Sequence, residues 1–420
     1  MNAISPDQSR EFAVEVVRCL REAGFETVWA GGCVRDHLLG RVPKDYDVAT
    51  SATPEEIRRV FGRRRTLTIG ASFGVITVLA PAGAEQIDVA TFRQDADYSD
   101  GRHPDGVTFS NAREDAQRRD FTINGLFYDP MEQRVIDYVN GEQDIKRKII
   151  RAIGDPEHRI QEDKLRMLRA IRFATTFQFE LEIDTERAIR QFSDELVVVS
   201  AERIAAEMRQ ILVHPERSRG VQLLGRLNLL KVVIPEVGQW CDGVGEEKET
   251  WLRILDALSD PTFPVSLAAL LWPVVREDTG LVGQVCRCWK LSNEETRRIE
   301  RMIACEGTLR RARQTDWPCL QRILIDPAID ELLQLATAIE YQTTGKIHET
   351  EFCRDRLQLD PAELNPLPLI TGDDLIFHGL SAGKEFRMLL DAVRDAQLNK
   401  QIASRKEALE LVDRLRERST

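Results

Sequence analysis

The chain has 420 residues, of which 42% are hydrophobic, and a formal net charge of −11 at pH 7. This length favours more than one domain and supplies enough apolar side chains for sizeable cores. The sequence has no apolar run of about 18 residues and no N-terminal basic and apolar stretch, so we expect neither a membrane span nor a secretory signal. The acidic balance excludes a protein that is basic throughout, although a local arginine cluster can still bind nucleic acid.

Eight cysteines are scattered over the whole chain. Only Cys286 and Cys288 come close together, and no CxxC pair repeats, which argues against a zinc site. We therefore expect reduced, mostly buried thiols and a cytoplasmic protein.

Helix and strand signals alternate over the first 150 residues. In chain order, we expect a helix over 8–23, a strand over 25–30, a turn at Gly31 and Gly32, a helix over 34–40, a strand over 45–50, a helix capped by Thr53, and a hairpin formed by 74–80 and 85–92. Beyond residue 150 strand signals almost vanish, and helical periodicities follow, such as 162–177 and the apolar segment 265–272. The sequence thus predicts a mixed α/β head followed by a largely helical remainder.

Two acidic residues are separated by one position in the expected strand over 45–50. Side chains at i and i+2 of a strand point to the same face, so Asp45 and Asp47 should project together. Two such carboxylates repel each other unless a cation lies between them, and oxygen ligands suit Mg²⁺. A pair of solvent-facing acids on an edge strand is the alternative, because the pattern alone is weak.

A glycine pair precedes these acids, between a strand and a helix start. Gly31 and Gly32 allow positive φ angles and close approach of a ligand to the backbone, and amides at a helix start attract phosphate. Arg35 can reach a triphosphate, whereas we expect Asp36 to hold the turn or Arg35. A simple tight turn is the alternative for the glycines alone. The combination predicts a nucleoside triphosphate on backbone amides, with metal ions on Asp45 and Asp47.

The stretch GGCVRDHLLGRVPKDYDVAT, residues 31–50, resembles the signature of the nucleotidyltransferase superfamily that includes DNA polymerase β. More narrowly, it is similar to the class II tRNA nucleotidyltransferases (CCA-adding enzymes) and to bacterial poly(A) polymerases. Later motifs follow in the family's order to about residue 210, and residues 369–386 are similar to its C-terminal region. The resemblance implies an α+β protein with a polymerase-β-like catalytic head and an all-α neck, body and tail. The expected boundaries are 1–150 for the head, 151–215 for a neck that recognises the base, 216–310 for the body and 311–420 for a tRNA-binding tail.

A second motif, RRDFTINGL at 118–126, resembles the family pattern RRDFTxNAL. The resemblance implies that Arg119 contacts the nucleotide and Asn124 the sugar. A salt-bridged helix start, with Asp120 paired locally, is the alternative. Gly125 stands where alanine is common, and glycine costs a helix about 1 kcal/mol, so we expect a looser local helix.

An i, i+3 row of charged residues follows in EDKLRMLRAIRF, namely Asp163, Arg166, Arg169 and Arg172. A carboxylate accepts from the amino group of cytosine or adenine, and a guanidinium donates to the adjacent ring atoms. Uracil and guanine present the opposite polarity there. The first two residues of the row can therefore select CTP and ATP without a template, and the resemblance assigns them this role. It places the other two near the nucleotide; a solvated basic face is the alternative.

A further helix carries Glu202, Arg203 and Glu207, which we interpret as structural support or as a simple ion-pair helix. Asp88 is the candidate third catalytic carboxylate, with a purely structural strand-end acid as the alternative. Residues 93–107 resemble the flexible loop that the family uses for the last A, which disfavours a CC-only enzyme; an ordinary exposed loop is the alternative.

The expected activity is template-independent addition of the 3′-terminal CCA, or part of it, to tRNA. In this reaction the primer 3′-hydroxyl attacks the α-phosphorus of CTP or ATP and pyrophosphate leaves, assisted by Mg²⁺. The alternatives are an A-adding or CC-adding tRNA nucleotidyltransferase, a poly(A) polymerase, and a catalytically silent RNA-binding protein. Contacts with tRNA should follow a narrow strip and depend strongly on salt. The sequence implies no membrane and no protein partner.

Overall fold

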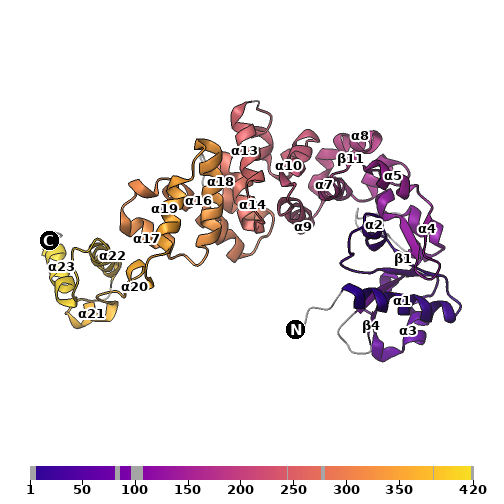
Figure 1. The fold of residues 1–420 in the computed structure, drawn as a ribbon, viewed down its shortest axis with the longest axis horizontal. Helices are drawn as coiled ribbons and strands as arrows, with labels where there is room; N and C mark the ends of the chain where they lie inside the picture. The colour runs from indigo at the N-terminus through magenta and orange to yellow at the C-terminus, as the bar shows by residue number, and fades with distance from the viewer. Residues whose placement is uncertain are drawn as a thin grey trace. The chain divides into compact units, whose positions relative to one another are not determined.

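The computed structural model describes residues 6–80, 86–95, 107–243, 245–275, 280–381 and 383–417. Contacts divide the chain into two compact units, 1–242 and 243–420, and each is described here by itself. The first unit combines a mixed sheet with helices, whereas the described residues of the second are helices and turns (Figure 1). The predicted α+β class, with a mixed head before a helical remainder, is confirmed. The four-part division of the chain stays a prediction.

A mixed sheet organises the head. Its described strands have the order β3-β4-β5-β2-β1-β8-β9, in which β2 and β5 are parallel and the other neighbours antiparallel. The strands are β1 (Thr27–Ala30), β2 (Val48–Thr50), β3 (Thr66–Leu67), β4 (Val75–Leu79), β5 (Gln86–Thr91), β8 (Leu126–Asp129) and β9 (Arg134–Asp137). The expected hairpin is confirmed by the antiparallel pairing of β4 and β5.

Short helices and turns surround this sheet and follow the predicted order. They are α1 (Pro6–Glu22), α2 (Gly32–Leu38), α3 (Pro54–Phe61), η1 (Arg63–Arg65), η2 (Ala71–Phe73), α4 (Ala112–Gln117), η3 (Thr122–Asn124) and α5 (Gly141–Arg147), with β6 (Arg93–Asp95) and β7 (Val107–Phe109) as a separate antiparallel pair. Helix α1 buries Val16 and Leu20 completely, as its periodicity predicts. The capping box at Thr53 and Glu56 is present at the start of α3.

The first unit continues with helices that carry one wall of the site. They are α6 (Pro156–Glu162), α7 (Arg166–Phe177), α8 (Ile183–Phe192), η4 (Ser193–Val198), α9 (Ala201–Leu212), α10 (Arg217–Arg226), α11 (Leu229–Val233) and α12 (Pro235–Trp240). Two short strands, β10 (Ile149–Ile150) and β11 (Glu180–Leu181), pair in parallel beside α7. These strands lie in the segment where strand signals were weakest, because two residues are too few to give a readable period.

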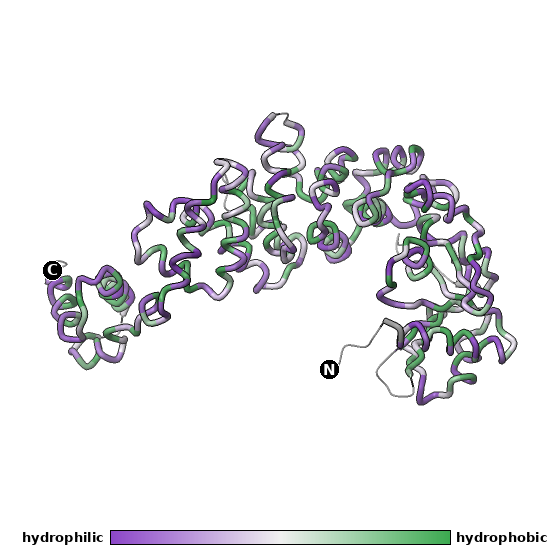
Figure 2. The backbone as a smooth tube through the Cα atoms, viewed as in Figure 1, coloured by the Kyte–Doolittle hydropathy of each residue, from purple (hydrophilic) through white to green (hydrophobic). Residues whose placement is uncertain are grey.

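The second unit is built from helices around apolar cores. They are α13 (Glu246–Asp256), α14 (Phe263–Val275), α15 (Leu281–Cys288), α16 (Asn293–Leu309), η5 (Ala312–Gln314), α17 (Trp317–Leu324), α18 (Ile329–Thr344), α19 (His348–Leu357), α20 (Pro361–Leu364), α21 (Gly372–Phe377), α22 (Lys384–Leu398) and α23 (Arg405–Glu417). Figure 2 shows hydrophobic segments gathered where α14, α16 and α18 pack together. Helix α14 is almost entirely buried, as predicted for 265–272.

Two further predictions concern the chain as a whole. All eight cysteines are free thiols and most are buried, although Cys288 and Cys319 are exposed. Over the residues that the structure describes, no helix combines the length and apolarity needed to cross a bilayer.

The expected loose helix around Gly125 is wrong, because this glycine follows the 3₁₀ turn η3 and precedes β8. A Cβ atom at this position would lie 2.8 Å from Val139 Cγ2 and 3.0 Å from Ile153 Cδ1. A side chain here would therefore force Val139 or Ile153 to shift, and the helix propensity of glycine is irrelevant.

We predict that Gly125→Ala destabilises the first unit by about 1–3 kcal/mol through overpacking. Gly225→Ala is the matched control, because Gly225 lies within α10 and its Cβ would meet no atom within 4 Å. That variant should be more stable than the wild type by up to about 1 kcal/mol. Urea unfolding followed by circular dichroism checks both values, and equal stability of the two variants would contradict the packing argument.

Candidate nucleotide site

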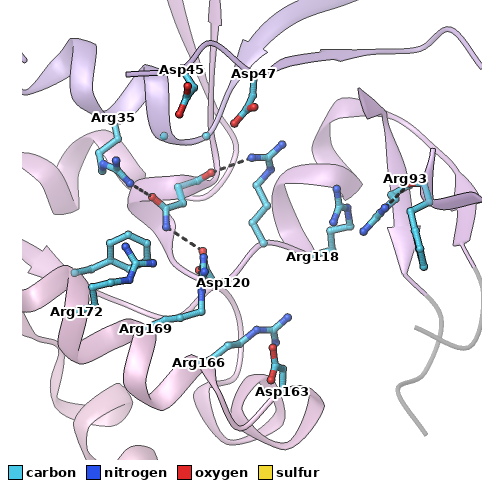
Figure 3. A pocket seen from close by; sticks show the side chains of 16 residues that line it. Arg35, Asp45, Asp47, Arg93, Arg118, Asp120, Asp163, Arg166, Arg169 and Arg172 are labelled. Atoms are coloured by element: carbon cyan, nitrogen blue, oxygen red, sulfur yellow. Dashed lines mark hydrogen bonds and ion pairs between the residues drawn. The ribbon is translucent and has the colours of Figure 1, made fainter. Parts of the chain in front are cut away.

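A cleft of about 1000 Å³ lies in the first unit, between the β1–α2 turn, the segment before β2, the α4–η3 segment and α7 (Figure 3). It contains every predicted site residue except Asp88. Its lining residues are Gly31, Gly32, Arg35, Asp45, Asp47, Phe73, Arg93, Arg118, Arg119, Asp120, Asn124, Asp163, Arg166, Arg169, Arg172 and Phe173. Segments separated by more than a hundred residues in the sequence thus share one cleft.

The glycine turn is dictated by two independent constraints at Gly31. Its φ angle is 73°, and a Cβ atom would lie 2.7 Å from Arg119 Nη1. Its amide donates to the Leu126 carbonyl at 3.0 Å, so this N–H group belongs to the fold and cannot also hold a phosphate. The expectation that amides of this turn bind phosphate therefore does not hold for the Gly31 amide. Gly32 begins α2, and its Cβ would meet only Arg35 Nη2, at 3.6 Å.

The paired acids lie in extended chain just before β2, which begins at Val48 and is shorter than predicted. Tyr46 between them is buried, whereas Asp45 and Asp47 are both exposed and direct their carboxylates into the cleft (Figure 3). The predicted common face is therefore confirmed, because the i, i+2 alternation extends beyond the strand. Neither carboxylate accepts a hydrogen bond from any residue that the structure describes. Desolvation raises the pKa of Asp47, and repulsion from Asp88 and Asp45 adds to this effect, while Arg119 opposes it.

Asp88 lies on β5, outside the main cleft, and accepts a hydrogen bond from Thr77 Oγ1 at 2.6 Å. It shares a smaller hollow of about 260 Å³ with Asp45 and Asp47. Among the described residues, no three His, Cys, Asp or Glu side chains are arranged to hold a metal ion. The structure therefore brings Asp88 near the pair without making it a third ligand, and its catalytic role stays a prediction.

Arg35 is held by protein contacts on several sides. Its Nη1 donates to Asn124 Oδ1 at 2.7 Å, and its Nε donates to Asp36 Oδ1 at 2.9 Å, which confirms the expected role of Asp36 in holding Arg35. Its guanidinium also lies 4.5 Å from the Phe177 ring centroid. Burial lowers the pKa of Arg35, although Asp36 counteracts this. The side-chain oxygen of Asn124 thus already accepts a hydrogen bond from Arg35, and a sugar hydroxyl that donates to this oxygen would have to share it.

Asp115 anchors both arginines of the RRDF motif, a role that the sequence reasoning missed. It is 1% exposed and pairs with Arg118 at 2.7 Å and Arg119 at 3.0 Å, the i+3 and i+4 positions. Burial alone would raise the pKa of Asp115, but the two guanidinium groups lower it below its ordinary value. The spacing of α4 was a usable signal, because neighbours three and four apart on a helix meet.

Asp120 connects the head motif to α7. Its Oδ2 accepts from Arg169 Nη2 at 2.5 Å, and its Oδ1 accepts from Asn124 Nδ2 at 3.0 Å. Burial favours a raised pKa, but these contacts outweigh it and lower the pKa of Asp120 to about 2. Local pairing of Asp120, the alternative considered from the sequence, is thus only part of its role, because its ion-pair partner lies 49 residues away.

Asp163 does not belong to the helix that carries the three arginines, so the predicted row is wrong in this respect. It terminates α6 with extended backbone (φ −148°, ψ 104°), and α7 begins only at Arg166. Its Oδ1 accepts from the Leu165 amide at 3.0 Å and its Oδ2 from Arg203 Nη2 at 2.7 Å. The side chain nevertheless lines the cleft beside Arg166, as Figure 3 shows.

Acidic partners hold the arginines of α7 as well. Glu162 pairs with Arg166, whose Nη1 also donates to the Arg159 carbonyl at 2.8 Å. Glu207 pairs with Arg172 at 2.6 Å and lies 3.8 Å from Arg169. The interpretation of Arg203 and Glu207 as support is consistent with these contacts, since both hold residues that line the cleft.

Aromatic side chains of the cleft were missed by sequence reasoning. The Phe173 ring lies beneath Arg172, with the guanidinium carbon 4.1 Å from the ring centroid, and near Arg169 and Arg35 at 5.4 and 5.5 Å. Phe73 also lines the cleft, and its carbonyl accepts from Arg93. The predicted switching loop, 93–107, lies mostly outside the described residues, which include only its ends.

Three family models match consecutive parts of the chain. Residues 27–151 match the poly A polymerase head domain, 178–241 the "Probable RNA and SrmB- binding site of polymerase A", and 266–412 the "tRNA nucleotidyltransferase domain 2 putative". The head and the cleft together therefore define a nucleotidyltransferase, and enzymes of this class generally use a divalent cation.

Similarity to known proteins extends over nearly the whole chain. It is 34% identical over 400 residues to a CCA-adding enzyme of Lactobacillus helveticus, which covers 95% of both chains, and 32% identical over 404 residues to that of Geobacillus stearothermophilus, with 94% and 95% covered. The structure of the Bacillus stearothermophilus CCA-adding enzyme in complex with CTP is similar at a TM-score of 0.78, with 29% identity and 99% of both chains covered. The chain therefore belongs to the family of CCA-adding enzymes, which are tRNA nucleotidyltransferases.

We predict that Gly31→Ala lowers incorporation of CMP at least tenfold, because the new Cβ would displace Arg119 and strain the positive φ angle. Gly32→Ala is the control and should lose less than threefold, since its Cβ has only an ordinary contact. Steady-state incorporation from CTP measures both. Similar losses in the two variants would contradict the assignment of the constraint to Gly31.

The Asp120–Arg169 pair predicts a pH dependence of stability. Because the folded pKa of Asp120 is about 2, against an ordinary value of 3.8, its ionised form stabilises the fold by about 2 kcal/mol. This contribution is complete above the unfolded pKa and is lost as the pH falls from about 4 towards 2. Asp120→Asn should therefore be less stable than the wild type at pH 7, with a difference that narrows by pH 3. Urea unfolding at both pH values tests this, and a constant difference would refute it.

Proposed function

We propose that this chain builds the complete 3′-terminal CCA of tRNA, without a template, from CTP and ATP. The observation that supports this most directly is the single cleft in which the Asp45–Asp47 pair lies opposite Asp163 and Arg166. One nucleotide can then place its phosphates near the Asp45–Asp47 pair and its base near Asp163 and Arg166, which carry opposite charges. The curated relatives, which the chain matches along nearly their full length, are named CCA-adding enzymes.

The metal of this reaction is, in our proposal, Mg²⁺ held by Asp45 and Asp47. Both carboxylates point into the cleft and accept no hydrogen bond from a described residue, and the pKa of Asp47 is raised by desolvation and neighbouring acids. Such a pair fits a cation that also binds substrate phosphates, since Mg²⁺ commonly uses one or two carboxylates in this way. When bound, the ion would supply charge neutralisation at the transferring phosphate and help ionise the attacking hydroxyl.

The protein groups around the triphosphate have distinct tasks. We assign Arg35 and Arg119 to the phosphates, because each is held by an acid and directed into the cleft. Their charge is then positioned before the substrate arrives, which lowers the cost of reorganisation during phosphoryl transfer. Asp120 and Asn124 act as positioning residues in this scheme, since they contact Arg169 and Arg35.

Base selection is assigned to Asp163 and Arg166. Asp163 accepts from an exocyclic amino group and Arg166 donates to the ring, so that cytosine and adenine satisfy both and uracil and guanine leave a charged group unpaired. Arg203 and Glu162 act as positioning residues that orient this pair. Arg169, Arg172 and Phe173 then form the adjacent wall against the nucleotide.

The acceptor, in this proposal, is tRNA, and the site of action is the cytoplasm. The family model of the second unit is a domain of tRNA nucleotidyltransferases, and one protein of similar fold is a Thermotoga maritima CCA-adding enzyme complexed with tRNA_CCA. We place the RNA-binding surface on the predicted body and tail.

We predict that the purified chain adds C, C and A in turn to a tRNA transcript that ends before CCA, and then stops. A transcript ending in CC should receive one A, while unrelated RNA, UTP and GTP should give no product. Gel analysis with labelled CTP or ATP measures each addition. Addition of A only, of C only, or of many A residues would identify the A-adding, CC-adding or poly(A) alternatives.

Matched variants in the same assay separate catalysis from RNA binding. Asp45→Ala and Asp47→Ala should each lower incorporation at least a thousandfold, with tRNA affinity within about threefold of the wild type, as expected for loss of metal catalysis. Asp88→Ala tests the third carboxylate, whose loss should have a similar effect if it is catalytic and a small one if Asp88 only bonds Thr77. Full activity without Asp45 or Asp47 would refute the proposed site.

A further inference from the structure

The second unit contains a cavity of about 730 Å³ that the transfer reaction does not use. It lies between η5, α17, α19 and the chain that connects α22 to α23. Leu320, Leu398 and Ile402 form its buried apolar floor. Trp317 and Phe352 are half-buried in its walls, and their rings are therefore accessible from inside the cavity. A volume of this size is typical of sites for small organic ligands.

Two arginines line the same cavity and lie against its aromatic rings. The guanidinium carbon of Arg356 is 4.7 Å from the Phe352 ring centroid and 5.7 Å from that of Trp317. That of Arg313 is 5.8 Å from the Phe352 ring. Neither guanidinium group forms an ion pair or hydrogen bond with any residue in the described part of the chain. One wall of the cavity therefore carries both aromatic rings and guanidinium groups.

Two other arginines of this unit are instead paired with acids. Arg322 pairs with Asp395 at 2.6 Å and Arg310 with Glu306 at 2.7 Å, as expected in a chain with more acidic than basic residues. Near the cavity, Glu363 is engaged by Lys400 at 3.6 Å. Arg313, which is exposed, and Arg356, which is half-buried beside Phe352 and Trp317, thus keep their positive charge available, and the partial burial of Arg356 strengthens its attraction for an anion relative to water.

We propose that this cavity binds a single nucleotide, either as one unpaired residue of an RNA strand or as a free mononucleotide. A flat base packs on aromatic rings and guanidinium planes, and its phosphate is a ligand for arginine. The apolar floor suits the base, and the two free cations suit the phosphate. The inference rests on the proposed function only for naming RNA as one source of the nucleotide, and the site is separate from the catalytic cleft.

The test compares the full-length wild type with Arg356→Ala in two binding experiments. Fluorescence anisotropy with a tRNA that lacks CCA should show about a tenfold higher Kd for the variant, and a salt dependence reduced by about one phosphate contact, if RNA supplies the nucleotide. Calorimetric titration with AMP should show two sites in the wild type and one in the variant if the nucleotide is free. Either result supports the cavity.

Two control variants distinguish loss of this site from a general loss of positive charge. Arg387→Ala removes an equal charge from an almost fully exposed side chain on α22, outside the cavity, and should leave both measurements within twofold of the wild type. Arg356→Lys keeps the charge without the planar group and should restore the salt dependence but not the full affinity. Unchanged RNA affinity and AMP stoichiometry in a folded Arg356→Ala, or equal losses in Arg387→Ala, would overturn the proposal. No readout needs CMP or AMP incorporation, so a failure of the proposed function would be recognised separately.

Discussion

The ion pair between Asp120 and Arg169 determines how the two walls of the cleft meet. One partner belongs to the segment before β8 and the other to α7, so the pair links these two walls directly. The pair is partly buried, with the Arg169 side chain 33% and the Asp120 side chain 10% exposed, and removing one partner leaves the other charge uncompensated. Asn124 and Arg35 extend the network to the glycine turn, and Glu207 extends it to Arg172. The cleft is therefore organised before any substrate binds.

The predicted arginines of the cleft and the Asp45–Asp47 pair differ in whether their side chains have ion-pair or hydrogen-bond partners among the described residues. The five arginines predicted for the site are each held by an acid, as Arg119 is by Asp115, which reduces the freedom that they would lose on binding an anion. Asp45 and Asp47 form no ion pair or hydrogen bond through their carboxylates within the described residues, and desolvation together with the neighbouring acids raises the pKa of Asp47. This asymmetry is what a nucleotidyltransferase requires, because phosphates need positioned cations and a metal ion needs available oxygens.

The second unit also contains arginines that lie against aromatic rings. Arg313 and Arg356 are paired with rings and not with acids, and they line an apolar cavity. In the cleft, Arg172 also lies over a ring, that of Phe173, but Glu207 holds it in place. An acidic partner fixes the position of a guanidinium group and partly neutralises its charge. An aromatic ring does not neutralise the charge, so more of it remains available to a ligand.

Local pattern by itself determined the mixed head, the helical remainder and the shared face of Asp45 and Asp47, because these features follow from periods of two and 3.6 residues. The spacing of Thr53 and Glu56 likewise determined the capping box. The resemblance to a known family supplied the predictions for Arg119 and Asn124, and it agreed with side-chain chemistry in the prediction that Asp163 and Arg166 select the base. Only the tertiary structure decided that Asp163 ends one helix while Arg166 begins the next, that Asp120 pairs with Arg169, and that Val139 and Ile153 pack closely around Gly125. Partners distant in sequence carry no local periodicity, so these contacts exist only once the chain has brought the segments together.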